Sequence, residues 1–205
     1  MVRITKDPEE RKEEIMDTAQ ELFLRAGFEK TSVNEIIKKV GVAKGTFYYY
    51  FHSKDEILGA IVERFINNIE VEVTGIQQNF ELNAQQKLQM ILIKLFYSGA
   101  GTEKLAQPID SERNGKIHRS LEEKFIVKFK PLILKVVVQG IKEKIFNTCH
   151  PEEITEILLI GIQGYMHINY PYFHNPDLRN KKMKALEELL ERALGTQKDS
   201  FNFTV

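Results

Sequence analysis

Apolar residues recur at intervals of three and four along most of the chain, which is the spacing of amphipathic helices. The first such run passes through Ile15, Ala19, Leu22 and Phe23, and Gly27 follows it as a natural helix end. Strict alternation of apolar and polar residues, which would predict strands, is confined to brief valine runs. The pattern therefore predicts an all-α protein.

Three helix-start signals divide the first seventy residues. Asp7–Glu10 combines a capping acid with a proline at the first helical position, and Ser32–Glu35 and Ser53–Glu56 are capping boxes. The second box opens a short helix that ends at Gly41, and about a dozen residues separate that glycine from the third box. That length allows a tight turn and one short helix, so this region is predicted to be a bundle of short helices.

The elements predicted beyond residue 73 are longer. The apolar periodicity places helices over Leu88–Phe96, Lys116–Asn147, Pro151–Asn169 and Asn180–Leu194. Pro131 is expected to kink the second of these or divide it in two. The segment Thr102–Gly115 lacks clear periodicity and is predicted to be an irregular connection.

Composition limits the class of protein. Hydrophobic residues make up 42% and charged residues 28% of 205 residues, the mix of a globular chain. The single Cys149 excludes a disulfide framework and a thiolate zinc cluster. The charged start lacks a signal peptide, and no run of about 18 apolar residues could span a bilayer. A cytoplasmic location, with no membrane association, is expected.

Charge is informative only locally. Lys+Arg 29 and Asp+Glu 29 cancel over the whole chain, but residues 30–54 hold five lysines and the single acid Glu35. A basic segment in a neutral chain fits a phosphate-binding surface. Charge alone also fits an ordinary solvated surface, and it favours that simpler interpretation.

Residues 31–54 combine the signals of a helix-turn-helix. A short helix is followed by a turn at Gly41–Val42 and by a second short helix rich in aromatic residues. Phe47 and Phe51 lie four apart and can face a core, so Lys44 and the threonine and tyrosines nearby project elsewhere. Their hydroxyl and ammonium groups can donate to phosphate oxygens and base edges. The alternative is that the tyrosines only cap a small three-helix core.

Two segments carry a resemblance to a known family. Phe28–Ile36 and Gly41–Leu58 resemble the DNA-binding signature of the TetR transcriptional regulators, and the match extends from about Glu9 to Ile69. The resemblance implies an N-terminal three-helix bundle over residues 1–70, with its helix-turn-helix at about 32–51. Residues 71–205 would then form a larger helical domain for effector binding and dimerisation.

The resemblance also implies function. Such proteins are homodimers that place one recognition helix per subunit in successive major grooves of palindromic operator DNA. Most are repressors that a small-molecule effector releases from DNA. The positions that match DNA-contacting positions of the family are Thr31, Ser32, Lys44, Gly45, Thr46, Tyr48, Tyr49, Tyr50 and Lys54.

Two positions in this region depart from the family pattern. Ala43 replaces a frequent serine, so the second helix lacks a side-chain cap. Tyr50 stands where histidine is common, which leaves the base preference at that position open.

Two sets of C-terminal residues are candidates for a dimer interface and an effector pocket. Burial within one subunit is the alternative for each residue, and for most pocket candidates the simpler one. The interface candidates are Ile157, Gly161, Gly164, Met183, Leu186, Leu190 and Ala193. The pocket candidates are Phe96, Tyr97, Phe125, Phe129, Gln163, Tyr165, Met166, His167 and Tyr170.

An enzyme is the main alternative class, and the sequence gives it little support. It contains no zinc-protease motif, no nucleophile elbow, no glycine-rich phosphate loop and no CxxC pair. The scattered histidines show no metal-binding spacing, so neither a metal nor a cofactor is expected. A homodimeric helical small-molecule-binding or scaffold protein with vestigial DNA binding is the third possibility.

Overall fold

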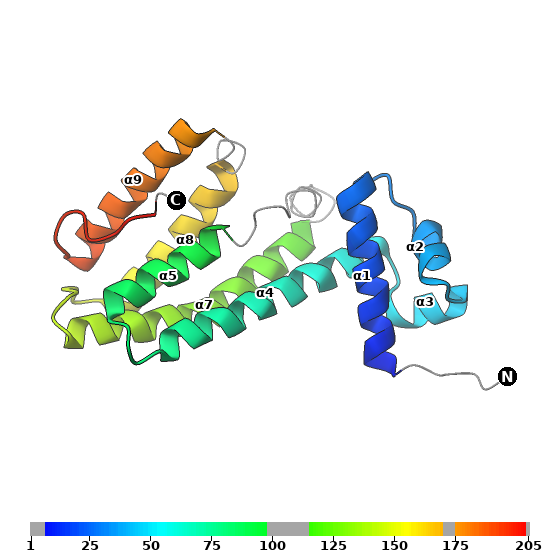
Figure 1. Ribbon diagram of the computed structural model, residues 1–205, viewed down its shortest axis with the longest axis horizontal. Coiled ribbons are helices and arrows are strands. Elements are labelled where there is room, and N and C mark those ends of the chain that lie inside the picture. The colour runs from blue at the N-terminus through cyan, green and yellow to red at the C-terminus, as the bar shows by residue number, and fades with distance from the viewer. Residues whose placement is uncertain (1–6, 98–114, 170–174, 204–205) are drawn as a thin grey trace. The chain divides into compact units, whose positions relative to one another are not determined.

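The computed structural model describes residues 7–97, 115–169 and 175–203, which form helices and no strands (Figure 1). The all-α prediction is confirmed for these residues. The chain divides into two compact units. One holds the residues up to Asn67 and the start of α7 (Gly115–Lys142) as far as Glu122, and the other holds the remainder.

The first unit contains α1 (Pro8–Ala26), α2 (Val33–Val40), α3 (Lys44–Tyr50) and the first part of α4 (Lys54–Gln78). The helices begin at the predicted caps. The Asp7 carboxylate accepts the Glu9 N–H at 2.9 Å, and Ser32 and Glu35 form the reciprocal bonds of a capping box. These local signals place α2 and α3 in immediate succession.

The core of the first unit joins its four helices. Helix α1 contacts α2, and the Phe23 and Phe28 rings meet edge to face at 5.0 Å between centroids. The buried apolar side chains include Ile15, Ala19, Phe23, Phe28, Ile36, Phe47, Phe51, Ile57, Leu58 and Ile61. Helices α1 to α4 all contribute to this buried set, which anchors α3 through Phe47.

The second unit contains the rest of α4 and α7 together with α5 (Ala84–Tyr97), α8 (Pro151–Asn169) and α9 (Pro176–Leu194). Helix α7 continues through Pro131, so the predicted division into two helices is not found. The buried side chains of Phe129 and Ile133 hold the helix on both sides of the proline. Helix α9 starts earlier than predicted because the Asn175 side chain caps it.

Four helices of the second unit surround an apolar cavity of about 20 Å³, which is roughly the size of one water molecule. Its lining comes from α5, α7, α8 and α9, through Leu88, Leu92, Ile133, Val137, Thr155, Leu158, Leu159, Ile162, Leu190 and Leu194. These four helices therefore pack around one closely filled core. Over the described ranges, no helix combines the length and apolarity that crossing a bilayer requires.

Candidate nucleic-acid interface

Helix α3 presents nearly all of its surface to solvent. Phe47 is its one buried residue, whereas Lys44, Thr46 and Tyr48 are exposed and Tyr49 reaches 76% exposure. No residue of the helix is acidic. A large exposed aromatic surface without carboxylates is unusual for a solvated helix and suits contact with a polyanion.

The opposite side of α3 is anchored in the core, as the sequence predicted. Phe47 and Phe51 are buried, and Val42 in the preceding turn is half-buried. Gly41 ends α2 with a φ of 76°, a left-handed conformation that favours glycine. This turn and these two phenylalanines direct the polar face of α3 outward.

The side chains on the exposed face are arranged by contacts with one another. The Lys44 ammonium lies 5.9 Å from the centre of the Tyr48 ring, within the range of a cation–π interaction. The Tyr49 and Tyr50 rings meet edge to face at 4.9 Å. These contacts restrict the rotamers of the tyrosines and so present their hydroxyl groups in a defined arrangement.

Gly45 has no packing partner that requires a glycine. A Cβ atom built at this residue would meet no atom of the chain within 4 Å. Glycine has a low helix propensity, and none of the described residues packs against Gly45 closely enough to require it. A binding partner that approaches the backbone closely would explain the glycine.

Thr31 lies just before the start of α2, as expected, but its side chain is buried. Its side chain is 3% exposed, and its hydroxyl donates to the Gly27 carbonyl at 2.8 Å and the Leu22 carbonyl at 3.4 Å. Since the hydroxyl binds the carbonyls at the end of α1, it cannot reach a phosphate. Thr31 therefore fixes the connection between α1 and α2.

Replacing Thr31 by valine should lower the free energy of unfolding by about 1–3 kcal/mol, because the Gly27 carbonyl loses its buried donor. Thr31→Ser retains the hydroxyl and should cost clearly less. Urea unfolding followed by circular dichroism measures both variants. Equal stability of Thr31→Val and the unchanged chain would contradict this structural role.

Ser32 is exposed, but its polar groups are engaged. Its N–H donates to the Glu35 carboxylate at 2.7 Å and its hydroxyl donates to the same oxygen at 2.8 Å. These bonds from the Ser32 backbone and side chain hold the pKa of the Glu35 carboxyl below its usual range. A phosphate that binds the Ser32 hydroxyl or N–H must displace the Glu35 carboxylate.

The Glu35 capping bonds should make stability depend on pH. A lowered pKa in the folded state contributes stability above the unfolded value of about 4.3, and this stability is lost as the pH falls through the folded pKa. Glu35→Gln should therefore lower the melting temperature at pH 7 and have little effect in acid. Glu10→Gln, at an exposed position of α1, serves as the control. An effect that is independent of pH would contradict the assignment.

Lys54 is tied to the protein rather than free for a phosphate. Its ammonium donates to the Phe28 carbonyl at 2.9 Å and the Glu29 carbonyl at 3.4 Å, and it lies 3.7 Å from the Glu29 carboxylate. It also lies 4.3 Å from the centre of the Phe28 ring. These contacts fasten the start of α4 to the connection between α1 and α2, so Lys54 must give up some of them before it can bind a phosphate.

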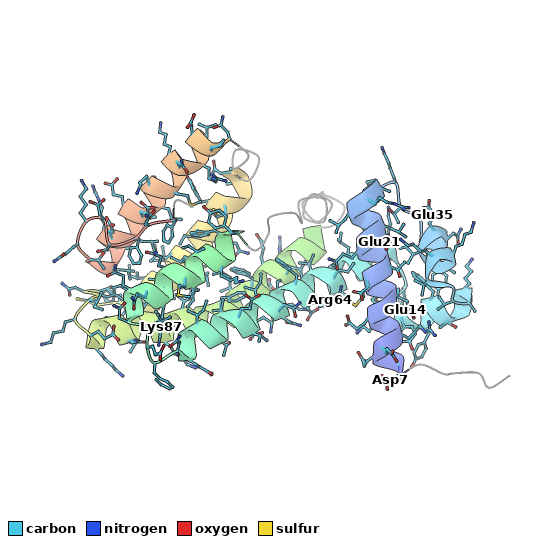
Figure 2. The ribbon with its side chains drawn as sticks, viewed as in Figure 1. Asp7, Glu14, Glu21, Glu35, Arg64 and Lys87 are labelled. Atoms are coloured by element: carbon cyan, nitrogen blue, oxygen red, sulfur yellow. The ribbon has the colours of Figure 1, made fainter. Side chains whose placement is uncertain are left out.

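Arg64 is a positioning residue that the sequence interpretation missed (Figure 2). From α4 its guanidinium binds Glu13, Asp17 at 2.8 Å and Gln20 at 2.8 Å, all on α1. Burial alone would lower the pKa of Arg64, but the bonds to Glu13 and Asp17 outweigh it and raise the pKa. The three acceptors are separated by four and three residues and so lie on one face of α1. This spacing is the sequence feature from which a cationic partner could have been predicted.

The described pocket candidates do not line the apolar cavity of the second unit. The Phe96 ring packs against Phe203 at 5.4 Å, and the Tyr97 hydroxyl donates to the Phe203 carbonyl at 2.9 Å. Phe125 and Phe129 pack against each other at 4.5 Å. None of these four lines the small apolar cavity of the second unit.

The remaining pocket candidates come from the second half of α8. Gln163, Tyr165 and Met166 are half-buried and do not line that cavity either. The side chain of His167 and the whole of Tyr170 lie outside the described residues. Among the described candidates, the Phe96 and Tyr97 contacts and the Phe125–Phe129 contact are separate.

The residues of α9 that were predicted to form the dimer interface face the interior of their own chain. Met183, Leu186 and Leu190 are buried in the core of their own chain, so they have no free surface for a second copy, and Ala193 is half-buried. When a helix carries one apolar stripe toward the core and another toward solvent, both stripes show the same spacing in the sequence. The spacing therefore cannot tell which stripe is exposed. The exposed stripe of α9 contains Leu178 and Leu189 instead.

The interface candidates of α8 do face solvent. Ile157 is 65% exposed, Gly161 is exposed, and a Cβ at Gly161 or Gly164 would meet no atom within 4 Å. Ile160 and Ile168 extend this apolar stripe and were not predicted. Exposed apolar stripes of this kind mark interaction surfaces.

Two family models match the chain. The model described as "Bacterial regulatory proteins, tetR family" matches residues 15–61, which include α2 and α3. The model described as "Tetracyclin repressor-like, C-terminal domain" matches residues 100–189. The two models describe regulatory proteins, not enzymes.

Curated relatives match part of the chain. The fatty acid metabolism regulator protein of Bacillus subtilis is 33% identical over 101 residues, which is 45% of this chain and 47% of the relative. The transcriptional regulator AcrR of Shigella flexneri is 32% identical over 51% of this chain and 49% of the relative. The chain therefore spans about half the length of these curated relatives.

Solved structures share the fold over most of the chain. The repressor SmeT of Stenotrophomonas maltophilia superimposes with a TM-score of 0.67 at 19% identity, covering 95% of this chain and 94% of SmeT. A transcriptional regulator from Cytophaga hutchinsonii has a TM-score of 0.66 at 22% identity, covering 89% of this chain and 94% of the regulator. With the DNA-binding signature and both family models in agreement, the chain belongs to the TetR family of bacterial transcriptional regulators.

Proposed function

We propose that this protein is a sequence-specific DNA-binding regulator, a repressor that a small-molecule effector releases from a palindromic operator. Residues 1–70 bind DNA, and residues 71–205 bind the effector and a second copy. The exposed, acid-free face of α3 is the observation that carries the proposal. The location is the cytoplasm, where the operator lies.

The contacts that the geometry supports are fewer than those the resemblance implied. Lys44, Gly45, Thr46, Tyr48 and Tyr49 are exposed on α3 and are assigned to bases and adjacent phosphates. The half-buried Tyr50, packed against Tyr49, is assigned a phosphate contact, and Ser32 contacts phosphate once Glu35 moves aside. Thr31 and Lys54 position these groups without touching DNA.

A gel-shift titration tests the proposal. DNA from upstream of the gene is titrated with the protein at several salt concentrations, in the presence of excess unrelated competitor DNA. We expect binding that resists competitor and weakens with rising salt. If DNA selected from a random pool also binds only weakly and without preference, the protein is a scaffold with vestigial DNA binding.

The homodimer is assigned to the exposed apolar stripes of α8 and α9. The α8 stripe contains Ile157, Ile160, Gly161, Gly164 and Ile168, and the small glycines allow close approach of a partner helix. The α9 stripe contains Leu178 and Leu189. A two-fold axis through these helices would form a four-helix interface that buries the exposed isoleucines and leucines.

Leu189→Glu should disrupt this dimer. A carboxylate buried in an apolar interface costs several kcal/mol, which raises the dimer Kd at least about 100-fold. Phe80→Glu replaces a 99% exposed side chain outside both stripes, so this variant should remain a dimer with an unchanged molar mass in solution. Sedimentation equilibrium measures both. A dimeric Leu189→Glu protein at micromolar concentration would place the interface elsewhere.

An effector that binds at the apolar cavity requires its four lining helices to move apart, because this cavity of about 20 Å³ is too small for an organic molecule. Helix α4 contributes residues to both units, so a ligand-dependent shift of α4 can change the spacing of the two recognition helices. Solution scattering that shows the same spacing with and without a bound effector would exclude this mechanism.

A further inference from the structure

Residues 200–203, which follow α9, pack onto the core of the second unit. After α9 the chain turns back, and residues 200–203 run beside this helix toward its start (Figure 1). Phe201 and Phe203 are fully buried, while Asn202 between them is exposed. The segment, here called the tail, is neither helix nor strand.

Aromatic contacts hold the two tail phenylalanines. Phe203 meets Phe96 of α5 edge to face at 5.4 Å, and Phe201 lies 6.5 Å from Phe146. Phe146 in turn rests on Gly140, where a Cβ atom would come within 2.1 Å of its ring. The glycine therefore makes room for the aromatic wall on which Phe201 rests.

Two glutamates of α9 bind the backbone of the tail. The Phe203 N–H donates to the Glu187 carboxylate at 2.7 Å, and the Phe201 N–H donates to the Glu191 carboxylate at 3.4 Å. Glu187 is 4% exposed and Glu191 8%. Buried carboxylates require hydrogen-bond donors, and these two receive them from alternate residues of an extended segment.

Two glutamines of α5 bind the other edge of the same segment. The Gln85 amide donates to the Ser200 carbonyl at 2.5 Å, and the Gln89 carbonyl accepts the Asn202 N–H at 3.2 Å. The glutamines lie four residues apart on α5, as the glutamates do on α9. Side chains of two helices thus take the place of neighbouring strands in recognising an extended backbone.

We propose that the groove between α5 and α9 is a binding site for extended aromatic–x–aromatic peptides, and that the tail is its resident and exchangeable occupant. The rings of such a peptide would pack against Phe96 and Phe146, and the Glu187 and Glu191 carboxylates would accept its alternate N–H groups. The four tail bonds above all go to side chains, so the tail can leave without opening a helix. A peptide of the same chemistry can then replace it.

The test uses a fluorescein-labelled peptide of the tail sequence, Asp-Ser-Phe-Asn-Phe-Thr-Val. It is titrated with the full-length protein and with a full-length variant that carries Phe201→Ala and Phe203→Ala. The variant should bind at least about 10-fold more tightly, because the unchanged tail competes at an effective concentration in the millimolar range. A peptide with both phenylalanines replaced by alanine should not bind.

A second substitution tests the polar half of the site. Adding Glu187→Ala to the double variant should weaken peptide binding at least about 10-fold, because a charged acceptor is lost. The proposal is wrong if the double variant keeps its helical circular dichroism but does not bind the peptide, or binds the alanine peptide equally.

Hydrogen exchange on the unchanged protein covers the case in which the double variant unfolds. A millimolar excess of unlabelled peptide should accelerate exchange of the Phe201 and Phe203 amides, because it displaces the tail. Unchanged exchange rates would also overturn the proposal.

Discussion

We expect the double variant Lys44→Ala, Tyr49→Ala to bind its operator at least about 100-fold more weakly than the unchanged protein. Tyr49 is 76% exposed on α3, and loss of a base contact costs about 1–3 kcal/mol. Removing Lys44 eliminates a phosphate contact, which weakens binding to all DNA sequences. It also lowers, by about one, the slope of the logarithm of the binding constant against the logarithm of the salt concentration. Gel shifts at several salt concentrations separate the two effects.

Matched substitutions away from α3 control for the loss of an aromatic ring and of a charge. Phe80→Ala removes a fully exposed ring, and Lys142→Ala removes an exposed lysine at the end of α7. Neither should change operator affinity by more than about 2-fold. If the α3 variant binds as tightly as these controls, α3 is not the recognition helix.

The layout of the first unit could be predicted because its signals are local. The capping box at Ser32, the Ser53 hydroxyl that accepts the Glu56 N–H and the glycine at Gly41 act within a few residues, so the sequence determines helix starts and ends directly. The direction of Phe47 and Phe51 followed from their spacing of four. All of these predictions are confirmed by the structure.

Side-chain roles near the interface were harder to predict, because they depend on contacts distant in the sequence. Thr31 reaches Leu22, and Lys54 reaches carbonyls of Phe28 and Glu29. No spacing rule marks such pairs. Residue type alone could therefore not distinguish a phosphate donor from a donor that is already satisfied inside the protein.

The second unit shows the same difficulty for apolar residues. Periodicity identifies an apolar stripe on a helix but not the partner that covers it. Met183 and Leu190 face their own core, while Ile157 and Leu189, on comparable stripes, face solvent. The contacts of the tail with Glu187 bring together residues whose pairing has no local pattern.

Phe47→Ala should cause the largest loss of stability among these substitutions, about 3–5 kcal/mol in the free energy of unfolding. Phe47 is fully buried and is the sole buried residue of α3, so its removal leaves a cavity where the recognition helix meets the core. Phe47→Leu retains most of the buried area and should cost about 1–2 kcal/mol. Phe80→Ala, at a 99% exposed ring, should stay within about 0.5 kcal/mol.

Urea unfolding of the Phe47 variants is best followed by circular dichroism, because the chain has no tryptophan. Operator binding should decline in the same order as stability, since α3 cannot hold its outward face once its anchor is lost. The Phe47→Leu variant is decisive, because it stays folded while loosening α3. Full operator affinity in a markedly destabilised Phe47→Ala protein would show that contacts outside the core, such as the Lys44–Tyr48 and Tyr49–Tyr50 pairs, are sufficient to orient the helix.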